Sequence, residues 1–238
     1  MPNPSEPDSD SPRGTKEEWV ASVLREGIIT GRFRSGSRLK QVELAKLLNT
    51  SITPVREALN LLEAEGYLTS SSHRGAIVGP FDESAPEELL ALRLMLEGRL
   101  VSRAAERLKA PQLSRLRSLA AEFAGLALAG NRAKVLAVNY RFHFAFYEAA
   151  DSPQALHFAR MLWARFPLNS LLGLSGRSQR SALEHEMLLQ AAEQRDVSEA
   201  VMAMRRHIEV GWDELLASRC AARLTAASGG GGKPRAKP

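Results

Sequence analysis

The sequence predicts a mainly α-helical protein that combines an N-terminal winged helix-turn-helix with a C-terminal all-helical antiparallel bundle of six or seven helices. Three observations predict this fold class. Two short helical patterns meet at a polar turn within residues 41–66, and two short strand patterns follow them directly. From Glu87 onward, apolar residues recur at helical spacing without a convincing strand. A chain of 238 residues can hold two small domains, each with its own core.

The first helix is predicted to begin at Thr15, because Thr15 and Glu18 have the spacing of a capping box. Two further helical patterns follow, separated by residues 49–51. Thr50, Ser51 or Thr53 is expected to cap the later one, and Pro54 suits its first turn. The apolar residues expected to be buried in this pair of helices are Val42, Leu44, Ala45, Leu47, Leu48, Val55, Ala58, Leu59 and Leu62.

The polar side of the later helix is predicted to contact DNA. Thr53, Arg56, Glu57 and Asn60 lie opposite its apolar stripe. A helix-turn-helix presents such N-terminal polar residues of its second helix to base edges and phosphates. The alternative interpretation is an ordinary helical hairpin with a solvated polar face.

Residues 67–69 and 76–78 read as two short strands joined by a polar turn, which is the pattern of a wing. The turn contains His73, Arg74 and Gly75, and a glycine beside a cation would let the backbone approach a phosphate or a minor groove.

These motifs, taken together, resemble the N-terminal winged helix of the GntR superfamily of bacterial regulators. The resemblance covers about residues 16 to 80 and rests on EGIITG, GSRL, ELA, SITPVREAL and EGYL as they stand in the sequence. It implies a DNA-binding role, in which Arg56 contacts bases or phosphates and Lys46 and Arg38 support it at phosphates. The full set of residues expected to contact DNA is Arg38, Lys46, Ser51, Thr53, Arg56, His73, Arg74 and Gly75.

The remainder of the chain divides at proline, glycine and asparagine positions. We expect a disordered segment over 1–14, the winged helix over 15–80, a linker over 81–86, a helical domain over 87–219, and a disordered basic tail over 220–238. The helical patterns run at about 87–109, 112–129, 132–150, 153–174, 179–194 and 197–219, and Pro167 decides whether the fourth is split.

Three of the five histidines fall on apolar stripes of this bundle. His143 lies in the third helical pattern, with Asn139 one turn before it, while His185 and His207 lie in the last two patterns. A buried imidazole needs a hydrogen-bond partner or a metal. A single one is more often a satisfied core histidine, but three that converge on one interior favour a metal or ligand cavity.

This half resembles the FCD effector domain of the FadR subfamily of GntR regulators. The resemblance covers roughly residues 87 to 217. It rests on Leu92-Arg93 to Glu97, Phe142-His143, Glu184-His185, Arg195-Asp196, Ala200 and His207-Ile208. It implies a metal held by Asn139, His143, His185 and His207, where Zn, Ni, Fe or Mn would suit the donors. Many metal-binding members carry aspartate where this chain has Asn139, and a neutral amide is a poorer ligand for a divalent cation.

Arg93 also falls on an apolar stripe, and a buried guanidinium must be paired. One interpretation is an ion pair with Glu97, one turn away. The other is a fork that binds the carboxylate of an effector.

Charge and composition exclude several classes of protein. The net charge of +5 arises in the last twenty residues, because residues 1–80 and 81–218 are each balanced, so global charge is weak evidence for DNA binding. Cys220 is the sole cysteine, which excludes an internal disulfide and a thiolate zinc site. No apolar run approaches the roughly 18 residues of a membrane span, and the polar N-terminus lacks a secretion signal, so a cytoplasmic location with no membrane partner is expected.

The predicted function is that of a homodimeric, sequence-specific transcriptional regulator, with repression as the expected sign. A small organic acid bound in the helical half, directly or through a metal, would alter its affinity for a double-stranded operator. Two alternatives remain open at this point. One is a metal-dependent hydrolase with Glu184 or Glu186 as its base, and the other is a constitutive DNA-binding dimer without an effector.

Overall fold

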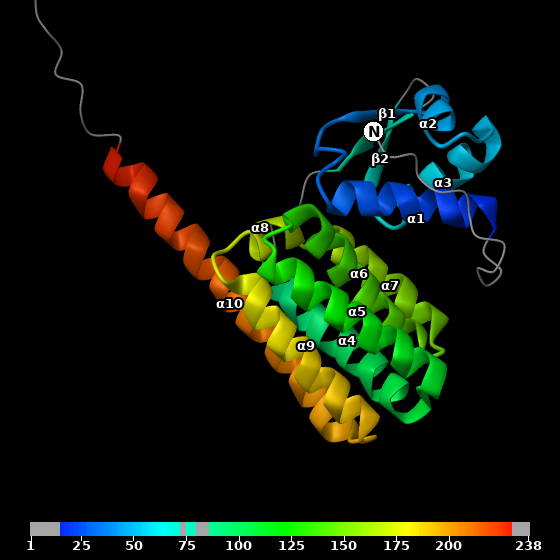
Figure 1. Cartoon of the computed structure of the whole chain (residues 1–238). Helices are drawn as coiled ribbons and strands as arrows, with labels where there is room; N and C mark the ends of the chain where they lie inside the picture. The colour runs from blue at the N-terminus through cyan, green and yellow to red at the C-terminus, as the bar shows by residue number, and fades with distance from the viewer. Residues whose placement is uncertain (1–14, 72–74, 80–85, 230–238) are drawn as a thin grey trace, which may run out of the picture.

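The structure, a computed structural model, describes residues 15–71, 75–79 and 86–229. Its elements in chain order are α1 (Lys16–Ile29), β1 (Arg38–Lys40), α2 (Gln41–Leu47), α3 (Ile52–Ala64), β2 (Leu68–Ser71), β3 (Gly75–Val78), α4 (Pro86–Arg107), α5 (Ala110–Leu128), α6 (Arg132–Glu148), α7 (Pro153–Ala164), α8 (Leu168–Leu172), α9 (Arg177–Glu193) and α10 (Val197–Gly229). Figure 1 shows the first six elements packed as a small unit against one end of a bundle formed by the helices from α4 to α10. The predicted fold class is confirmed.

The helix α1 begins as its sequence predicts. The Thr15 hydroxyl oxygen accepts from the backbone amide of Glu18 at 3.4 Å, and the Glu18 carboxylate accepts from the amide of Thr15 at 2.9 Å. The capping box is therefore present. It satisfies the backbone amides of Thr15 and Glu18, which have no carbonyl partner within the helix.

The helices α2 and α3 form the predicted helix-turn-helix, and Asn49 ends α2 with a positive φ of 48°. The whole predicted stripe of α3 is buried, but in α2 the side chains of Val42 and Leu47 are 55% and 44% exposed. Their predicted burial is wrong, because a helix of seven residues makes about two turns and offers α3 only one narrow face. Ser51 occupies the N-cap position of α3 without a side-chain hydrogen bond, so its predicted capping bond is also absent.

The wing is part of a three-stranded antiparallel sheet with the order β1-β3-β2. Leu68 pairs with Val78 and Ser71 with Gly75, which sets the register of the hairpin. The strands are shifted by one or two residues from the predicted ranges. The third strand, β1, corresponds to what the sequence suggests only as a short extended piece before α2.

The bundle contains seven described helices, because Pro167 separates α7 from α8. Proline lacks the amide that a continuous helix would need at this position. The last helix is longer than predicted. It runs on to Gly229, so the expected end at 219 and the expected disorder of 220–229 are wrong. Alanine, the strongest helix former, recurs through this stretch and sustains the helix beyond the body of the bundle, as Figure 1 shows.

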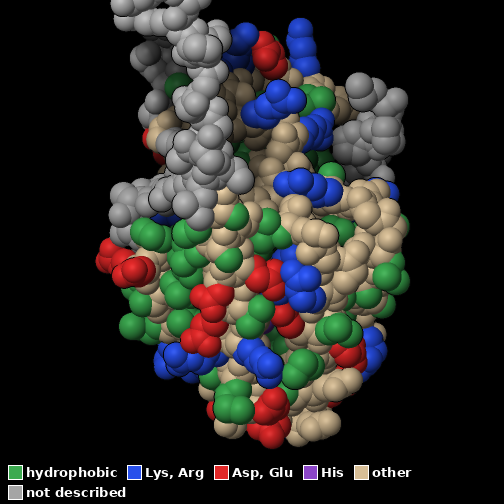
Figure 2. Space-filling model, turned by 90° about the vertical axis from the view of Figure 1, so that its left-hand side faces the viewer, with side chains coloured by type: hydrophobic (Ala, Val, Ile, Leu, Met, Phe, Trp, Pro, Cys, Tyr) green, Lys and Arg blue, Asp and Glu red, His purple; other side chains and the backbone are tan. Residues whose placement is uncertain are grey.

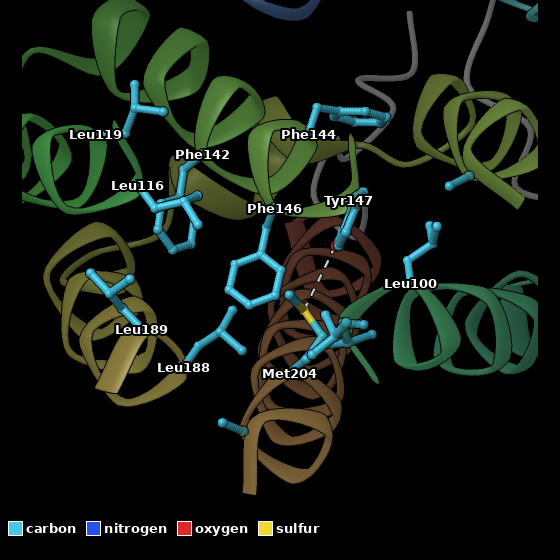
Figure 3. Close-up of a cluster of buried hydrophobic side chains, with 14 of the residues drawn as sticks. Leu100, Leu116, Leu119, Phe142, Phe144, Phe146, Tyr147, Leu188, Leu189 and Met204 are labelled. Atoms are coloured by element: carbon cyan, nitrogen blue, oxygen red, sulfur yellow. Dashed lines mark hydrogen bonds between the residues drawn. The ribbon is translucent and has the colours of Figure 1, made fainter. Parts of the chain in front are cut away.

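The core of the bundle is arranged around α6, whose aromatic side chains leave it in several directions. Figure 3 shows Phe146 pointing toward Leu188 of α9 and Met204 of α10, while Phe144 lies on the other side of α6. Phe142, Phe146 and Tyr147 are fully buried. This packing fixes α6 between its neighbours and so fixes the polar residues that α6 carries.

The short helix α8 lies between the bundle core and the winged helix. Leu168, Leu171 and Leu172 are buried in the bundle, whereas Asn169 accepts from the guanidinium of Arg132 through its backbone carbonyl at 2.7 Å. The Asn169 amide nitrogen would lie 3.8 Å from a Cβ placed on Gly31, in the turn after α1. The two parts of the molecule therefore approach each other at α8, and they also meet where α1 contacts α6.

Candidate functional site

The first turn of α3 carries the side chains that the sequence assigns to DNA. Ser51, Thr53 and Arg56 are all exposed there. The Nε and Nη2 atoms of Arg56 donate to one carboxylate oxygen of Glu57, each at 3.2 Å. The Arg56 side chain is 54% exposed, so this surface pair contributes little energy and does not prevent a phosphate or a base edge from taking the guanidinium.

A second group of cations lies beside the sheet. Arg32, Arg34, Arg38 and Lys40 line a surface groove of about 340 Å³, where Glu43 is held by Lys40 at 2.7 Å. Lys46 is exposed on α2. Figure 2 shows mainly Lys and Arg among the charged side chains on this face of the upper part of the molecule, which holds the winged helix, whereas the bundle below carries both signs mixed. This distribution suits the phosphate backbone of a duplex.

The wing tip gives a mixed outcome. His73 and Arg74 lie outside the described residues. Gly75 is described as the first residue of β3, and a Cβ added to it would lie only 2.5 Å from the backbone oxygen of Leu39. The close approach of β1 is thus sufficient to explain a glycine here without any contact to DNA.

The three histidines predicted to converge do so, at the centre of the bundle. His143 comes from α6, His185 from α9 and His207 from α10, and one nitrogen of each lies within 4.8 Å of the others. His143 and His185 are buried, and the His207 side chain is 13% exposed. Aromatic packing helps to position the cluster, because the ring of Phe142 stacks on that of His185 with centroids 4.4 Å apart.

The hydrogen bonds assign the protons of two of these imidazoles. The Tyr147 hydroxyl donates its proton to Glu97, so its oxygen accepts from Nδ1 of His143 at 3.1 Å. Nδ1 of His207 faces the Glu184 carboxylate at 2.6 Å and donates to it. In both rings Nε2 is therefore left with a lone pair, which is the form that binds a metal.

His185 differs from the other two. Its Nε2 lies 3.2 Å from Nε2 of His143 and donates to that lone pair, while its Nδ1 has no partner among the described residues. Burial, reinforced by the neighbouring imidazoles, lowers the pKa of His143 and of His185 well below the usual value. Both rings are neutral at pH 7, as metal ligands must be.

Glu184 anchors the cluster on its outer side. Burial raises the pKa of this carboxyl, but hydrogen bonds from His207 and Arg177 outweigh it, and the net pKa is lowered. Arg177 grips Glu184 through two bonds of 2.8 and 2.6 Å and is itself fully buried. With both oxygens engaged, Glu184 orients His207 and is not placed as a free base for hydrolysis.

Asn139 lines a small cavity together with His143, His207 and Ser181. Its side-chain oxygen is buried and has no hydrogen-bond partner within the described residues, and the same is true of the Ser181 hydroxyl. Buried acceptors are rarely left unpaired, so the cavity suits a guest that offers a positive charge or a proton. Its volume is about 20 Å³, which is enough for one ion or one water molecule. The cavity thus offers a cation the imidazoles of His143 and His207 and the amide oxygen of Asn139, whereas His185 belongs to the histidine cluster but does not line the cavity. These donor types suit a divalent metal.

Arg93 lines the same cavity, but its guanidinium is already paired. Its Nε donates to Glu97 at 2.6 Å, and both side chains are at most 4% exposed. The guanidinium also lies over the ring of Phe166, 4.1 Å from its centroid. The predicted ion pair with Glu97 is present, and a role in binding an effector stays a prediction.

Two contributors were not predicted from the sequence. Tyr147 is one helical turn after His143, so the same i, i+4 spacing that linked Asn139 to His143 would have identified it. Arg177 falls in a stretch that the sequence presents as a break between helices, and no sequence signal marks it as the buried partner of Glu184 and Glu214.

Comparison with known proteins identifies both halves of the chain. Residues 16–78 match the model of "Bacterial regulatory proteins, gntR family", and residues 88–210 match that of the FCD domain. The chain is 28% identical to the Nta operon transcriptional regulator of Aminobacter aminovorans, over 79% of this chain and 89% of the relative. It is 29% identical to a probable D-xylose utilization operon transcriptional repressor of Paenarthrobacter nicotinovorans, over 84% and 90%.

Solved structures agree on the fold. McbR/YncC of E. coli aligns with a TM-score of 0.73 at 24% identity, over 87% of this chain and the whole of that one. No described helix combines the length and the apolar character that a bilayer crossing requires. The matches are to transcriptional regulators and do not support a hydrolase. The chain belongs to the gntR family of bacterial regulatory proteins with a C-terminal FCD domain, and it is a DNA-binding transcriptional regulator.

Proposed function

We propose that the regulator binds a near-palindromic operator as a homodimer, with two copies of α3 in successive major grooves about 34 Å apart. The observation that carries this proposal is the exposed polar first turn of α3, flanked by the cationic groove beside β1. Arg56 reads bases or phosphates, Ser51 and Thr53 assist it, and Arg38 and Lys46 hold the backbone. Repression is the proposed sign, because the relative from Paenarthrobacter nicotinovorans is described as a probable repressor. A protein that acts on chromosomal DNA works in the cytoplasm.

The test is selection of bound sequences from random duplex DNA, followed by titration of the selected operator at fixed salt. Arg56→Ala should weaken binding by about 1–3 kcal/mol, which is roughly 5- to 150-fold. The matched control is Arg205→Ala, since Arg205 is an exposed arginine in a surface pair with Glu209 on the bundle. Equal affinity of the Arg56 variant and the control would contradict the proposed reading face.

Dimerisation is proposed through the outer faces of α4 and α10. Met95 is 69% exposed and Met202 is 56% exposed, and the helices that carry them touch where Gly98 meets Val201. Solvated methionines on adjoining helices suit an apolar subunit contact. Light scattering should give a dimer for the wild type and a monomer for Met95→Glu with Met202→Glu. Leu128→Glu, which alters a still more exposed apolar side chain on α5, should leave the dimer intact.

We further propose that His143, His185, His207 and Asn139 hold one divalent cation, with Zn, Ni, Fe and Mn as the candidates. When bound, the cation supplies a positive charge at the bundle centre and open positions for an anionic group. Glu184 and Tyr147 keep two of the imidazoles in the ligating tautomer, and His185 must move its proton from Nε2 to Nδ1 to join them.

Metal titration of chelator-treated protein tests this proposal. His143→Ala should abolish binding at one site per chain, whereas His157→Ala, a histidine outside the cluster, should not. Asn139→Asp should tighten binding at least tenfold, because it restores a carboxylate to the cavity. Unchanged stoichiometry in His143→Ala would overturn the assignment of the site.

A small organic acid is the proposed effector, and operator and effector must alter each other's affinity by the same factor. The cavity restricts how the acid binds. At about 20 Å³ it admits a cation or a water molecule but no organic molecule unless the α8 leucines move. Crystals grown with metal and a candidate acid should therefore show α8 displaced if the acid ligates the cation.

A further inference from the structure

A larger hollow lies between the winged helix and the bundle. Its volume is about 560 Å³, which is within the range of small-molecule sites. The winged helix supplies residues of α1 and of the C-terminal end of α3, and the bundle supplies residues of α5, α6 and α7. An occupant of this interdomain pocket would touch the DNA-reading helix and the effector half at once.

The charges around the interdomain pocket favour an anion. Four arginines and His157 line it against three glutamates. Arg25 is neutralised by a two-pronged bond to Glu65, with contacts of 2.9 and 2.7 Å. Arg115, exposed on α5, has no charged partner among the described residues, and the Nε of Arg160 is buried without a hydrogen-bond partner there. Arg160 itself donates through Nη2 to Glu148 at 3.4 Å, a long and partly exposed pair that contributes little energy. Arg115 is therefore open to a ligand, and Arg160 can exchange Glu148 for a ligand carboxylate.

The floor of the pocket is aromatic. Tyr140 stacks on Phe144 with centroids 4.2 Å apart, and the Arg160 guanidinium lies 5.6 Å from the centre of the Phe144 ring. Tyr140 also meets Trp163 edge-on at 5.9 Å, and Trp163 lies 5.0 Å from the ring of His143. A ligand resting on Tyr140 is thus linked to the histidine cluster by two ring contacts.

We propose that the interdomain pocket is a second effector site, which binds a small organic dicarboxylate. One carboxylate is taken by Arg115 and the other by Arg160, where it replaces the partly exposed contact with Glu148. The Tyr140 hydroxyl adds a third donor from the floor. In this proposal the small cavity beside the histidines binds a cation, and the interdomain pocket binds the organic acid.

Binding at this site would fix the angle between the two halves. Leu61 and Glu65 of α3 line one wall, so a ligand held by α5 and α7 restrains the helix that reads DNA. Only this consequence rests on the proposed DNA-binding function, because ligand binding itself is measured without DNA.

The experiment is isothermal titration of the full chain in the presence of a chelator, with succinate and phthalate as dicarboxylate probes. Butyrate and benzoate serve as monocarboxylate controls. We expect one site per chain for at least one dicarboxylate and at least tenfold weaker binding of its monocarboxylate partner. Arg115→Glu and Arg160→Gln should each weaken dicarboxylate binding at least tenfold. Arg206→Glu, which changes an exposed arginine on α10 away from the pocket, should leave it unchanged.

Three outcomes would overturn the proposal. The first is that no dicarboxylate binds to the wild type. The second is that Arg115→Glu and Arg160→Gln both bind the dicarboxylate as tightly as the wild type. The third is that Arg206→Glu loses as much affinity as the pocket variants, which would indicate a general charge effect. Thermal unfolding without ligand verifies that each variant is folded. Arg115 is exposed, so its variant keeps the test valid if Arg160→Gln fails to fold. His143→Ala should retain succinate binding while losing metal, which separates this site from the histidine cluster.

Discussion

The candidate site residues are exposed on the surface in the winged helix and buried in the interior of the bundle. In the winged helix Arg56, Lys46 and Thr53 are exposed, and the core beneath them is almost wholly apolar. In the bundle His143, His185 and Asn139 are buried. The Nδ1 atom of His143 has a hydrogen-bond partner, whereas Nδ1 of His185 and the side-chain oxygen of Asn139 have none among the described residues. Polar residues on a surface can be satisfied by water, whereas a buried polar cluster needs a partner for each of its polar atoms.

Each part nevertheless contains a deeply buried ion pair. Arg25 and Glu65 join α1 to the end of α3, and Arg93 and Glu97 lie one turn apart on α4. The first pair holds the winged helix together near the interdomain pocket. The second pair also accepts the Tyr147 proton and so sets the tautomer of His143. The same kind of ion pair joins two helices in one half and orients a histidine of the buried cluster in the other.

The largest expected effect comes from breaking these pairs. Glu65→Ala and Glu97→Ala should each lower the free energy of unfolding by about 3–5 kcal/mol, because each leaves a buried guanidinium without its partner. Calorimetry of the two variants should show the loss in different parts of the unfolding profile if the two cores melt separately. Glu43→Ala removes an exposed partner of Lys40 and should cost less than about 1 kcal/mol. A loss in Glu97→Ala no greater than that of Glu43→Ala would contradict the comparison.

A smaller effect should appear with pH in metal-free protein. The folded pKa values of His143 and His185 are lowered by burial, so the unfolded chain binds more protons below about pH 6.5, the ordinary histidine value. Stability is therefore complete above that value and falls as the pH drops through it, by up to about 1.4 kcal/mol per pH unit for each histidine. Urea unfolding at pH 7.5, 6.5 and 5.5 measures this slope. His185→Gln should halve it, and a flat profile in the wild type would show that the rings are not buried as neutral groups.

The smallest effect concerns helix caps, in which the two halves should not differ. Thr15→Ala removes the cap of α1, and Asn131→Ala removes the oxygen that accepts from the Lys134 amide at the start of α6. Each should cost about 1 kcal/mol in urea unfolding. Ser51→Ala, at an N-cap without a side-chain bond, should leave stability unchanged. Any loss of operator affinity in Ser51→Ala would then report contact with DNA.

The sequence predicted the exposed face of α3 more completely than the contacts of the buried cluster. Once Val55, Ala58, Leu59 and Leu62 are assigned to the core, the polar residues of α3 must lie on its opposite, exposed face. Val42 was assigned wrongly, since the sequence does not reveal that α2 presents so narrow a face to its neighbour.

In the bundle, spacing along single helices was enough to place the three histidines in one interior. It could not supply contacts between helices. The bonds from His207 to Glu184 and from Glu184 to Arg177 depend on how α9 and α10 pack, and so does the small size of the cavity. Arg177 was assigned to a loop because the glycines and serines before it resemble a break, yet it is fully buried at the start of α9.

The shortness of α8 has a mechanical consequence. Leu168 and Leu171 form part of the wall around the ion-sized cavity, and Asn169 sits against the turn at Gly31. A helix of five residues has too few internal hydrogen bonds to be stable by itself, so its position depends on the side chains packed around it. Because α8 borders the cavity on one side and the turn at Gly31 on the other, we expect a change in the size of the cavity to alter both contacts together.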